Sequence, residues 1–154
     1  MKVLVVEDEE HKSNDLVARL GQHGVGMQTI TLANSVREAV LAVTQYNYDL
    51  IVLDMALPTF SKGADSDQVG GLAQSSGGIE VLRTLHAVGA QARIIIVTQY
   101  PEIVINGVNA KPTQVAGIVA KRYGQEVLGT VIYSFNTPEW GRTFDRIIGG
   151  NVWP

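Results

Sequence analysis

Apolar residues occur along the chain in two patterns that alternate from one end to the other. Short unbroken runs, such as Leu50–Leu53 and Ile94–Val97, are typical of parallel strands buried on both faces. Between these runs, apolar residues recur at intervals of three and four, which predicts amphipathic helices. We expect strands near 2–6, 27–32, 50–53, 93–98 and 130–135, and helices near 10–22, 35–43, 79–88, 113–123 and 139–148.

Local signals mark where some of these elements begin and end. Ser35 followed by Glu38 is a capping box, which predicts a helix start, and Gly24 is a plausible helix end. Residues 59–78 are rich in Gly, Ser, Asp and Gln, and we expect a flexible insertion there. Residues 102–112 form an irregular, fairly apolar connection to which the sequence assigns no element.

The order of the elements predicts the fold class. Five strands that alternate with helices, without tandem hairpin signals, predict an α/β fold with a doubly wound five-stranded parallel sheet and right-handed crossovers. A chain of 154 residues suits a single domain over 1–154. The strand order 2-1-3-4-5 would place strands one, three and four side by side.

Polar residues follow these three neighbouring strands directly. Strand one ends in Glu7 and Asp8, strand three in Asp54, and strand four in Thr98. Open α/β sheets bind ligands at the carboxyl edge of their strands, so these side chains are the first candidates for a site. The structural alternatives are that Asp54 caps a turn and that the acidic residues after strand one begin a helix.

Three carboxylates at one edge raise one another's pKa unless a cation joins them. A hard divalent cation with oxygen ligands, Mg²⁺ in a cell, is the natural partner. An Asp beside such an ion can act as a nucleophile toward a phosphoryl group, and a Thr hydroxyl can hydrogen-bond a phosphoryl oxygen. The strand ends therefore predict a magnesium site with phosphoryl chemistry at Asp54.

Composition excludes several other classes. A formal net charge of −3 gives no reason to expect direct binding to nucleic acid or to an anionic membrane. The absence of Cys excludes disulfides and thiolate chemistry. No membrane span or signal peptide is visible and no effector segment follows the last helix, so we expect a cytoplasmic protein.

The chain resembles the response-regulator receiver domain of two-component signalling. The resemblance rests on Val3–Glu9, Tyr48–Pro58, Gly78–Leu82 and Ile94–Thr98. It implies a flavodoxin-like fold in which Asp54 is the phosphoacceptor. Glu7, Asp8, Asp54 and the backbone carbonyl of Ala56 would hold Mg²⁺, and Thr98 would be the switch hydroxyl. It also implies a histidine kinase or phosphotransfer protein as partner, a possible downstream protein partner, and no enzymatic activity beyond the domain's own phosphorylation and dephosphorylation.

Departures from the family pattern surround this site. The family has a Lys followed by Pro just after the fifth strand, and here Thr137 precedes Pro138 in that place. Lys111, also followed by Pro, is a candidate substitute on another element. A register one residue away would put Asn136 there instead and make Tyr133 a reporter aromatic on the fifth strand.

The residues after Thr98 depart as well. The family usually has a small residue there, whereas this chain has Gln99 and then Tyr100, which we place at the mouth of the pocket. A long amide and a ring at that point could block a phosphodonor or shield the phosphoryl group from water. The insertion over 59–78, directly after the phosphoacceptor strand, could cover the site or present a partner surface.

Two functions remain open from the sequence. The first is a receiver phosphorylated on Asp54 with Mg²⁺. The second is a pseudo-receiver that serves as a phosphorylation-independent interaction module. A haloacid-dehalogenase-like phosphatase would need a second Asp at position 56, which is Ala. A dinucleotide-binding fold would need a Gly-rich turn after strand one.

Overall fold

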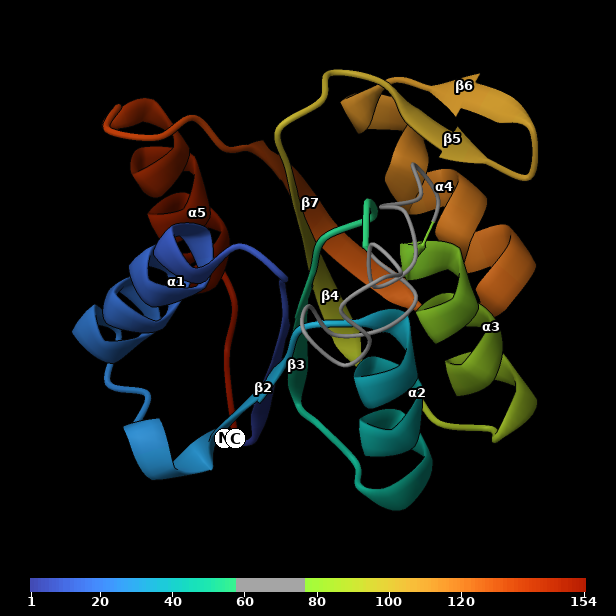
Figure 1. Cartoon of the computed structure of the whole chain (residues 1–154), viewed down its shortest axis with the longest axis horizontal. Helices are drawn as coiled ribbons and strands as arrows, with labels where there is room; N and C mark the ends of the chain where they lie inside the picture. The colour runs from blue at the N-terminus through green and yellow to red at the C-terminus, as the bar shows by residue number, and fades with distance from the viewer. Residues whose placement is uncertain (58–76) are drawn as a thin grey trace, which may run out of the picture.

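The computed structural model describes residues 1–57 and 77–154, and these form a sheet between two layers of helices (Figure 1). Five parallel strands pair in the order β2-β1-β3-β4-β7. The strands are β1 (Val3–Val6), β2 (Ile30–Ala33), β3 (Leu50–Leu53), β4 (Arg93–Thr98) and β7 (Glu126–Ile132). The doubly wound parallel sheet and its strand order are thereby confirmed.

Two helices cover one face of the sheet and three cover the other (Figure 1). The first pair is α1 (Glu10–Gln22) and α5 (Glu139–Gly149); the second group is α2 (Val36–Gln45), α3 (Gly78–Ala87) and α4 (Pro112–Tyr123). Each layer has its own apolar core against the sheet. Because β1 and β3 are buried on both faces at every residue, their sequences are continuous apolar runs.

The residues predicted to begin α2 and to end α1 do so in the structure. The Ser35 hydroxyl accepts a hydrogen bond of 3.2 Å from the Glu38 N–H, and the Glu38 carboxylate accepts one of 3.1 Å from the Asn34 N–H. Ser35 therefore caps α2, while Glu38 bonds back to the N–H of the residue before the cap and not to that of Ser35 itself. Gly24 follows α1 with a φ of +83°, a conformation in which Gly ends a helix without strain.

The connection over 102–112, to which the sequence assigned no element, contains a β-hairpin that forms a two-stranded sheet separate from the five-stranded one. β5 (Ile103–Ile105) and β6 (Val108–Ala110) pair antiparallel beyond the end of β4. Asn106 and Gly107 form the turn with φ values of +52° and +78°. Tight hairpin turns need positive φ at both central residues, which is why Asn-Gly favours them.

The fifth strand of the sheet begins and ends earlier than expected. β7 starts at Glu126 and contains Gly129, where its pairing with β4 shifts by one residue. A Cβ on Gly129 would lie 2.5 Å from the Ile147 Cδ1 atom, so this Gly lets α5 approach the strand and does not end it. The strand expected over 27–32 is also displaced, because Met27–Thr29 form a short 3₁₀ helix (η1) before β2.

Most of the insertion expected over 59–78 lies outside the described residues, which resume at residue 77. The helix α3 starts at Gly78, directly against the end of β3. A Cβ on Gly78 would come within 3.0 Å of the Asp54 carbonyl oxygen. None of the helices in the described part of the chain combines the length and apolar character needed to cross a bilayer.

Candidate functional site

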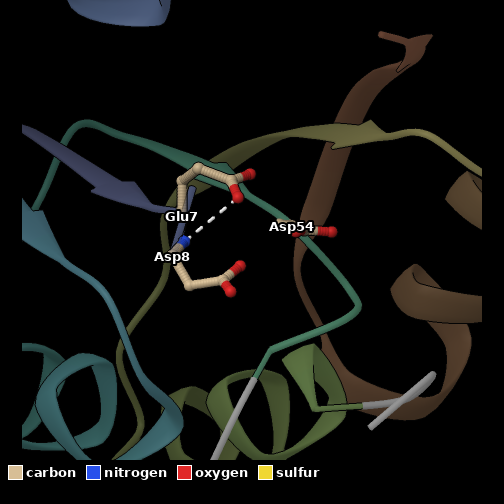
Figure 2. A group of neighbouring side chains, drawn as sticks. All are labelled: Glu7, Asp8 and Asp54. Atoms are coloured by element: carbon tan, nitrogen blue, oxygen red, sulfur yellow. Dashed lines mark hydrogen bonds between the residues drawn. The ribbon is translucent and has the colours of Figure 1, made fainter. Parts of the chain in front are cut away.

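Three carboxylates meet at the carboxyl edge of the sheet. Val6 of β1 pairs with Leu53 of β3, so the residues that follow them, Glu7 and Asp54, leave neighbouring strands at the same level. Glu7, Asp8 and Asp54 each offer a carboxylate oxygen, and these oxygens lie within 4.8 Å of one another (Figure 2). We call these three residues the acidic cluster.

Burial dominates the electrostatics of this cluster. Asp54 is only 7% exposed and Glu7 only 4%, whereas Asp8 is half-buried. Burial raises the pKa of the Asp54 carboxyl, although the nearby Lys12 ammonium and the Ala56 N–H oppose this. Burial, and then the charge of Asp54, raise the pKa of Glu7 as well. Both groups therefore need positive charge or hydrogen bonds to stay ionised.

Backbone hydrogen bonds fix the orientation of the two buried carboxylates. Asp54 Oδ1 accepts a hydrogen bond of 3.0 Å from the Ala56 N–H. Glu7 Oε1 accepts hydrogen bonds from the Asp8 N–H at 3.0 Å and the Glu9 N–H at 3.1 Å. The turns after β1 and β3 thus position these side chains before any ligand binds.

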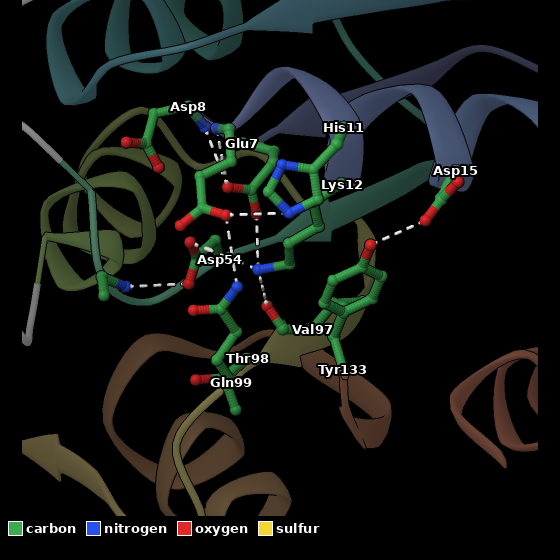
Figure 3. Close-up of polar contacts among 12 residues, drawn as sticks. Glu7, Asp8, His11, Lys12, Asp15, Asp54, Val97, Thr98, Gln99 and Tyr133 are labelled. Atoms are coloured by element: carbon green, nitrogen blue, oxygen red, sulfur yellow. Dashed lines mark hydrogen bonds and ion pairs between the residues drawn. The ribbon is translucent and has the colours of Figure 1, made fainter. Parts of the chain in front are cut away.

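Lys12 is part of this site, and the sequence reasoning missed it. Its ammonium lies 2.6 Å from Glu7 Oε2 and 3.4 Å from Asp54 Oδ2, and it donates a hydrogen bond of 3.1 Å to the Val97 carbonyl (Figure 3). Lys12 stands four residues before Leu16 and eight before Leu20, so it shares the buried stripe of α1. A Lys at a stripe position is the signal that could have identified it.

Thr98 is buried at the end of β4, and its hydroxyl accepts a hydrogen bond of 3.1 Å from the Tyr100 N–H. Tyr100 is 59% exposed and, with Met55, Ala56 and Thr98, lines a cavity of about 480 Å³ beside the acidic cluster. The side chain of Gln99 extends instead toward the loop after β1. Its amide donates to Glu9 Oε2 at 3.2 Å, and this oxygen also lies 3.2 Å from His11 Nε2.

Tyr133 directly follows β7, and its amide donates to the Thr98 carbonyl at 2.7 Å. Its ring is buried on the α1 side of the sheet, with the Lys12 ammonium 5.7 Å from the ring centre. Thr137 lies four residues further on, half-buried, with its hydroxyl bonded to the Ser134 carbonyl. Lys111 is exposed and stands at the N-cap of α4. The structure brings neither Thr137 nor Lys111 into a contact with Asp54 among the described residues.

The donors of the acidic cluster suit a hard cation. All are oxygens, and Glu7 and Asp54 are too buried for water to screen their charges. With the three carboxylates ionised and one Lys12 ammonium among them, two negative charges remain. The residues present therefore fit a divalent ion such as Mg²⁺, with Glu7, Asp8 and Asp54 as its carboxylates.

A doubly wound parallel sheet with such a cluster at its carboxyl edge defines a flavodoxin-like domain with its ligand site at that edge. Comparisons with known proteins narrow this class. No protein-family model matches the chain. It is 30% identical over 135 residues to the Detocs response regulatory protein DtcB of Vibrio alginolyticus, across 87% of this chain and 89% of that protein. It is 32% identical over 98 residues to the two-component response regulator PhoP of Pseudomonas aeruginosa, across 64% of this chain and 35% of PhoP.

Solved structures show the same fold. The response regulator TrrA of Thermotoga maritima, solved with Mg²⁺ and beryllium fluoride, aligns with a TM-score of 0.56 and 24% identity, over 96% of this chain and 99% of TrrA. The receiver domain of a Pseudomonas aeruginosa PAO1 sensor histidine kinase, with magnesium in its active-site cleft, aligns with a TM-score of 0.54 and 21% identity. The alignment covers 96% of this chain and 97% of that domain.

The chain therefore belongs to the response-regulator receiver family of two-component signalling. Receiver domains are in general signalling modules and not enzymes.

Proposed function

We propose that this receiver domain accepts a phosphoryl group on Asp54. The observation that carries the proposal is the position of the Asp54 carboxylate. It is buried at the end of β3, held by the Ala56 N–H, and surrounded by Glu7, Asp8 and the Lys12 ammonium. A carboxylate held in this way can act as a nucleophile, with the Lys12 ammonium and a bound divalent ion as the positive charges beside it.

The donor would be a phosphohistidine of a histidine kinase or phosphotransfer protein. An oxygen of Asp54 attacks the phosphorus, so that a new O–P bond forms while the P–N bond to the imidazole breaks. The imidazole nitrogen keeps the electron pair of the broken bond and takes up a proton. The product is an aspartyl phosphate, which carries about two negative charges where the carboxylate carried one.

Mg²⁺ would be held by the carboxylates of Glu7, Asp8 and Asp54 together with the backbone carbonyl of Ala56. When bound, it supplies positive charge that stabilises the transferring phosphoryl group. The half-buried position of Asp8 leaves one side of the acidic cluster open to solvent, from which an ion could enter. The magnesium in the TrrA and histidine-kinase receiver structures supports this choice of ion.

Thr98 would report the phosphoryl group to the rest of the domain. Its hydroxyl accepts the Tyr100 N–H and can still donate its own proton to a phosphoryl oxygen. A Thr98 that moves toward Asp54 would change the position of Tyr100 and the shape of the adjoining cavity. Gln99 and Tyr100 at the pocket mouth would thereby couple phosphorylation to a surface that a downstream protein partner can bind.

Acetyl phosphate with Mg²⁺ tests the proposal directly. We expect wild-type protein to gain one phosphoryl group, seen as a retarded band in a phosphate-affinity gel and as the matching mass increase. Asp54→Asn is expected to abolish this product, because an amide is a poor nucleophile toward phosphorus. The measurement is the fraction of protein phosphorylated at matched times.

Asp49→Asn is the matched control. Asp49 precedes β3, at the opposite end of the strand from Asp54, and its carboxylate accepts the Lys2 N–H at 2.7 Å. We expect Asp49→Asn to be phosphorylated like the wild type. If wild-type protein forms no Asp54-dependent product with acetyl phosphate and gives no response to beryllium fluoride, a phosphorylation-independent interaction module is the correct description.

A further inference from the structure

The amine of Lys12 is buried at a position where helices normally carry an apolar side chain. Lys12 is 1% exposed, and it heads the stripe of α1 that Leu16 and Leu20 continue. Lys is almost never buried so completely unless its charge is paired. Its burial therefore requires a compensating set of partners, and the structure shows which groups provide it.

Three oxygens surround the ammonium, which carries three N–H donors. Glu7 Oε2 is closest, at 2.6 Å, and the Val97 carbonyl accepts at 3.1 Å. Asp54 Oδ2 lies farther away, at 3.4 Å. Glu7 and Val97 thus anchor the ammonium, while its longest contact faces the residue that would be phosphorylated.

Tyr133 closes the α1 side of this arrangement. Its ring lies beside the ammonium, and its hydroxyl donates a hydrogen bond of 2.6 Å to Asp15 Oδ2 on α1 (Figure 3). The hydrogen bond fixes the ring, and the ring keeps water away from Lys12. Because charges interact more strongly where water is excluded, Lys12 acts on Asp54 at an effective dielectric constant well below that of bulk solvent.

Lys12 and a divalent cation occupy different parts of the site. Figure 3 shows Lys12 reaching the acidic cluster from α1, whereas Asp8 lies on the other side of the cluster. Among the described residues, Lys12 is the one basic side chain that forms an ion pair with Asp54. The ammonium and a divalent ion can therefore be present together, and their three positive charges balance the three carboxylates.

We propose that Lys12, supplied by α1, is the cation that pairs with the phosphoryl group on Asp54. The inference rests on the proposed phosphorylation of Asp54. When the phosphoryl group adds a negative charge at Asp54, the ammonium donates a hydrogen bond to a phosphoryl oxygen in place of its longer ion-pair contact with Asp54 Oδ2. Glu7 and Val97 hold the ammonium in place throughout, so the site gains a charge-assisted hydrogen bond without reorganising.

Beryllium fluoride, which forms a phosphoryl mimic on Asp, tests this role in the whole chain by isothermal titration calorimetry. With Mg²⁺ saturating, Lys12→Met should bind beryllium fluoride roughly 10- to 100-fold more weakly, as expected for the loss of a charge-assisted hydrogen bond. The affinity for Mg²⁺ alone should be unchanged or higher, since Lys12 repels the ion. A Lys12→Met variant that loses both affinities together has not folded, and Lys12→Gln then decides the test.

Further variants keep the test decisive. Lys12→Gln retains N–H donors without the charge and should also bind beryllium fluoride weakly, which covers the case in which Lys12→Met does not fold. Lys111→Met removes an exposed Lys at the start of α4 and should behave like the wild type. Wild-type affinity in both Lys12 variants would refute the role of Lys12 and leave phosphorylation standing. A wild-type protein that forms no Asp54 adduct would instead refute the proposed function.

Discussion

Replacing Lys12 by Met is expected to lower the free energy of unfolding of the metal-free protein by about 3 kcal/mol at pH 8. The substitution leaves Glu7 without its ammonium partner and Asp54 without its nearest positive charge. The remaining buried carboxylates must then either stay ionised without compensation or take up protons. Urea denaturation in the presence of a chelator measures the loss.

A double variant distinguishes the loss of the Lys12–Glu7 ion pair from non-specific destabilisation by the substitution. Lys12→Met combined with Glu7→Leu removes both charges, and we expect it to recover most of the lost stability, because an apolar pair of similar size often replaces a buried ion pair without cost. Lys121→Met, at an exposed position near the end of α4, should change the free energy by less than about 0.5 kcal/mol. A Lys12→Met variant as stable as the wild type would show that the buried ion pair does not stabilise the fold.

The metal-free protein is also expected to become less stable as the pH rises from about 5 to about 8.5, by roughly 1–3 kcal/mol from the acidic cluster. The pKa values of Glu7 and Asp54 are raised in the folded state, so the native protein binds more protons than the unfolded chain in this range. Their contribution to stability is thus fully present below the unfolded pKa and is lost as the pH rises through the folded pKa.

Urea denaturation across this pH range, with chelator or with millimolar Mg²⁺, tests the expectation. Mg²⁺ should restore stability at high pH, where the carboxylates are ionised and bind it best. Glu7→Gln removes one of the two titrating groups and should flatten the pH dependence, while titrations elsewhere in the protein cancel in the comparison. A wild-type profile that rises from pH 5 to 8.5 as steeply as the Glu7→Gln profile would contradict the assignment.

The sequence predicts the frame of this protein well, because buried parallel strands must be apolar on both faces. In an α/β domain, the apolar runs over Leu50–Leu53 and Ile94–Val97 predict buried parallel strands. Strand order then brings the residues at the strand ends to one edge. Glu7, Asp8 and Asp54 are therefore accessible to reasoning from the sequence, and the structure brings their carboxylates together.

The fifth strand of the sheet was misplaced at a glycine. The sequence predicts a strand over 130–135, whereas Gly129 lies within β7, which starts at Glu126, and admits Ile147 of α5. Because the strand ends at Ile132 and not at residue 135, the residue that follows it is Tyr133. Tyr133, and not Thr137, therefore lies beside Lys12. The Asn106-Gly107 turn, in contrast, was a readable hairpin signal between two apolar segments.

Lys12 could not be found from polarity alone. A Lys near the start of a helix usually lies on the solvent side, and the acidic residues around it suggest surface ion pairs. Only its four-residue spacing from Leu16 indicates burial, and its partners come from the turn after β1, the turn after β3, and β4. Such a site is assembled by tertiary contacts over large sequence separations, which periodicity does not record.

The aromatic rings behind Lys12 give the site a natural optical readout. Tyr133 lies next to the ammonium, and the ring of Trp140 lies 5.0 Å from that of Tyr133. Trp153, the other indole of the chain, stacks on Arg93 near the opposite edge of the sheet. Trp140 is thus three contacts away from Asp54, through Tyr133 and Lys12, so the protein contains an intrinsic fluorophore for its own phosphoacceptor pocket.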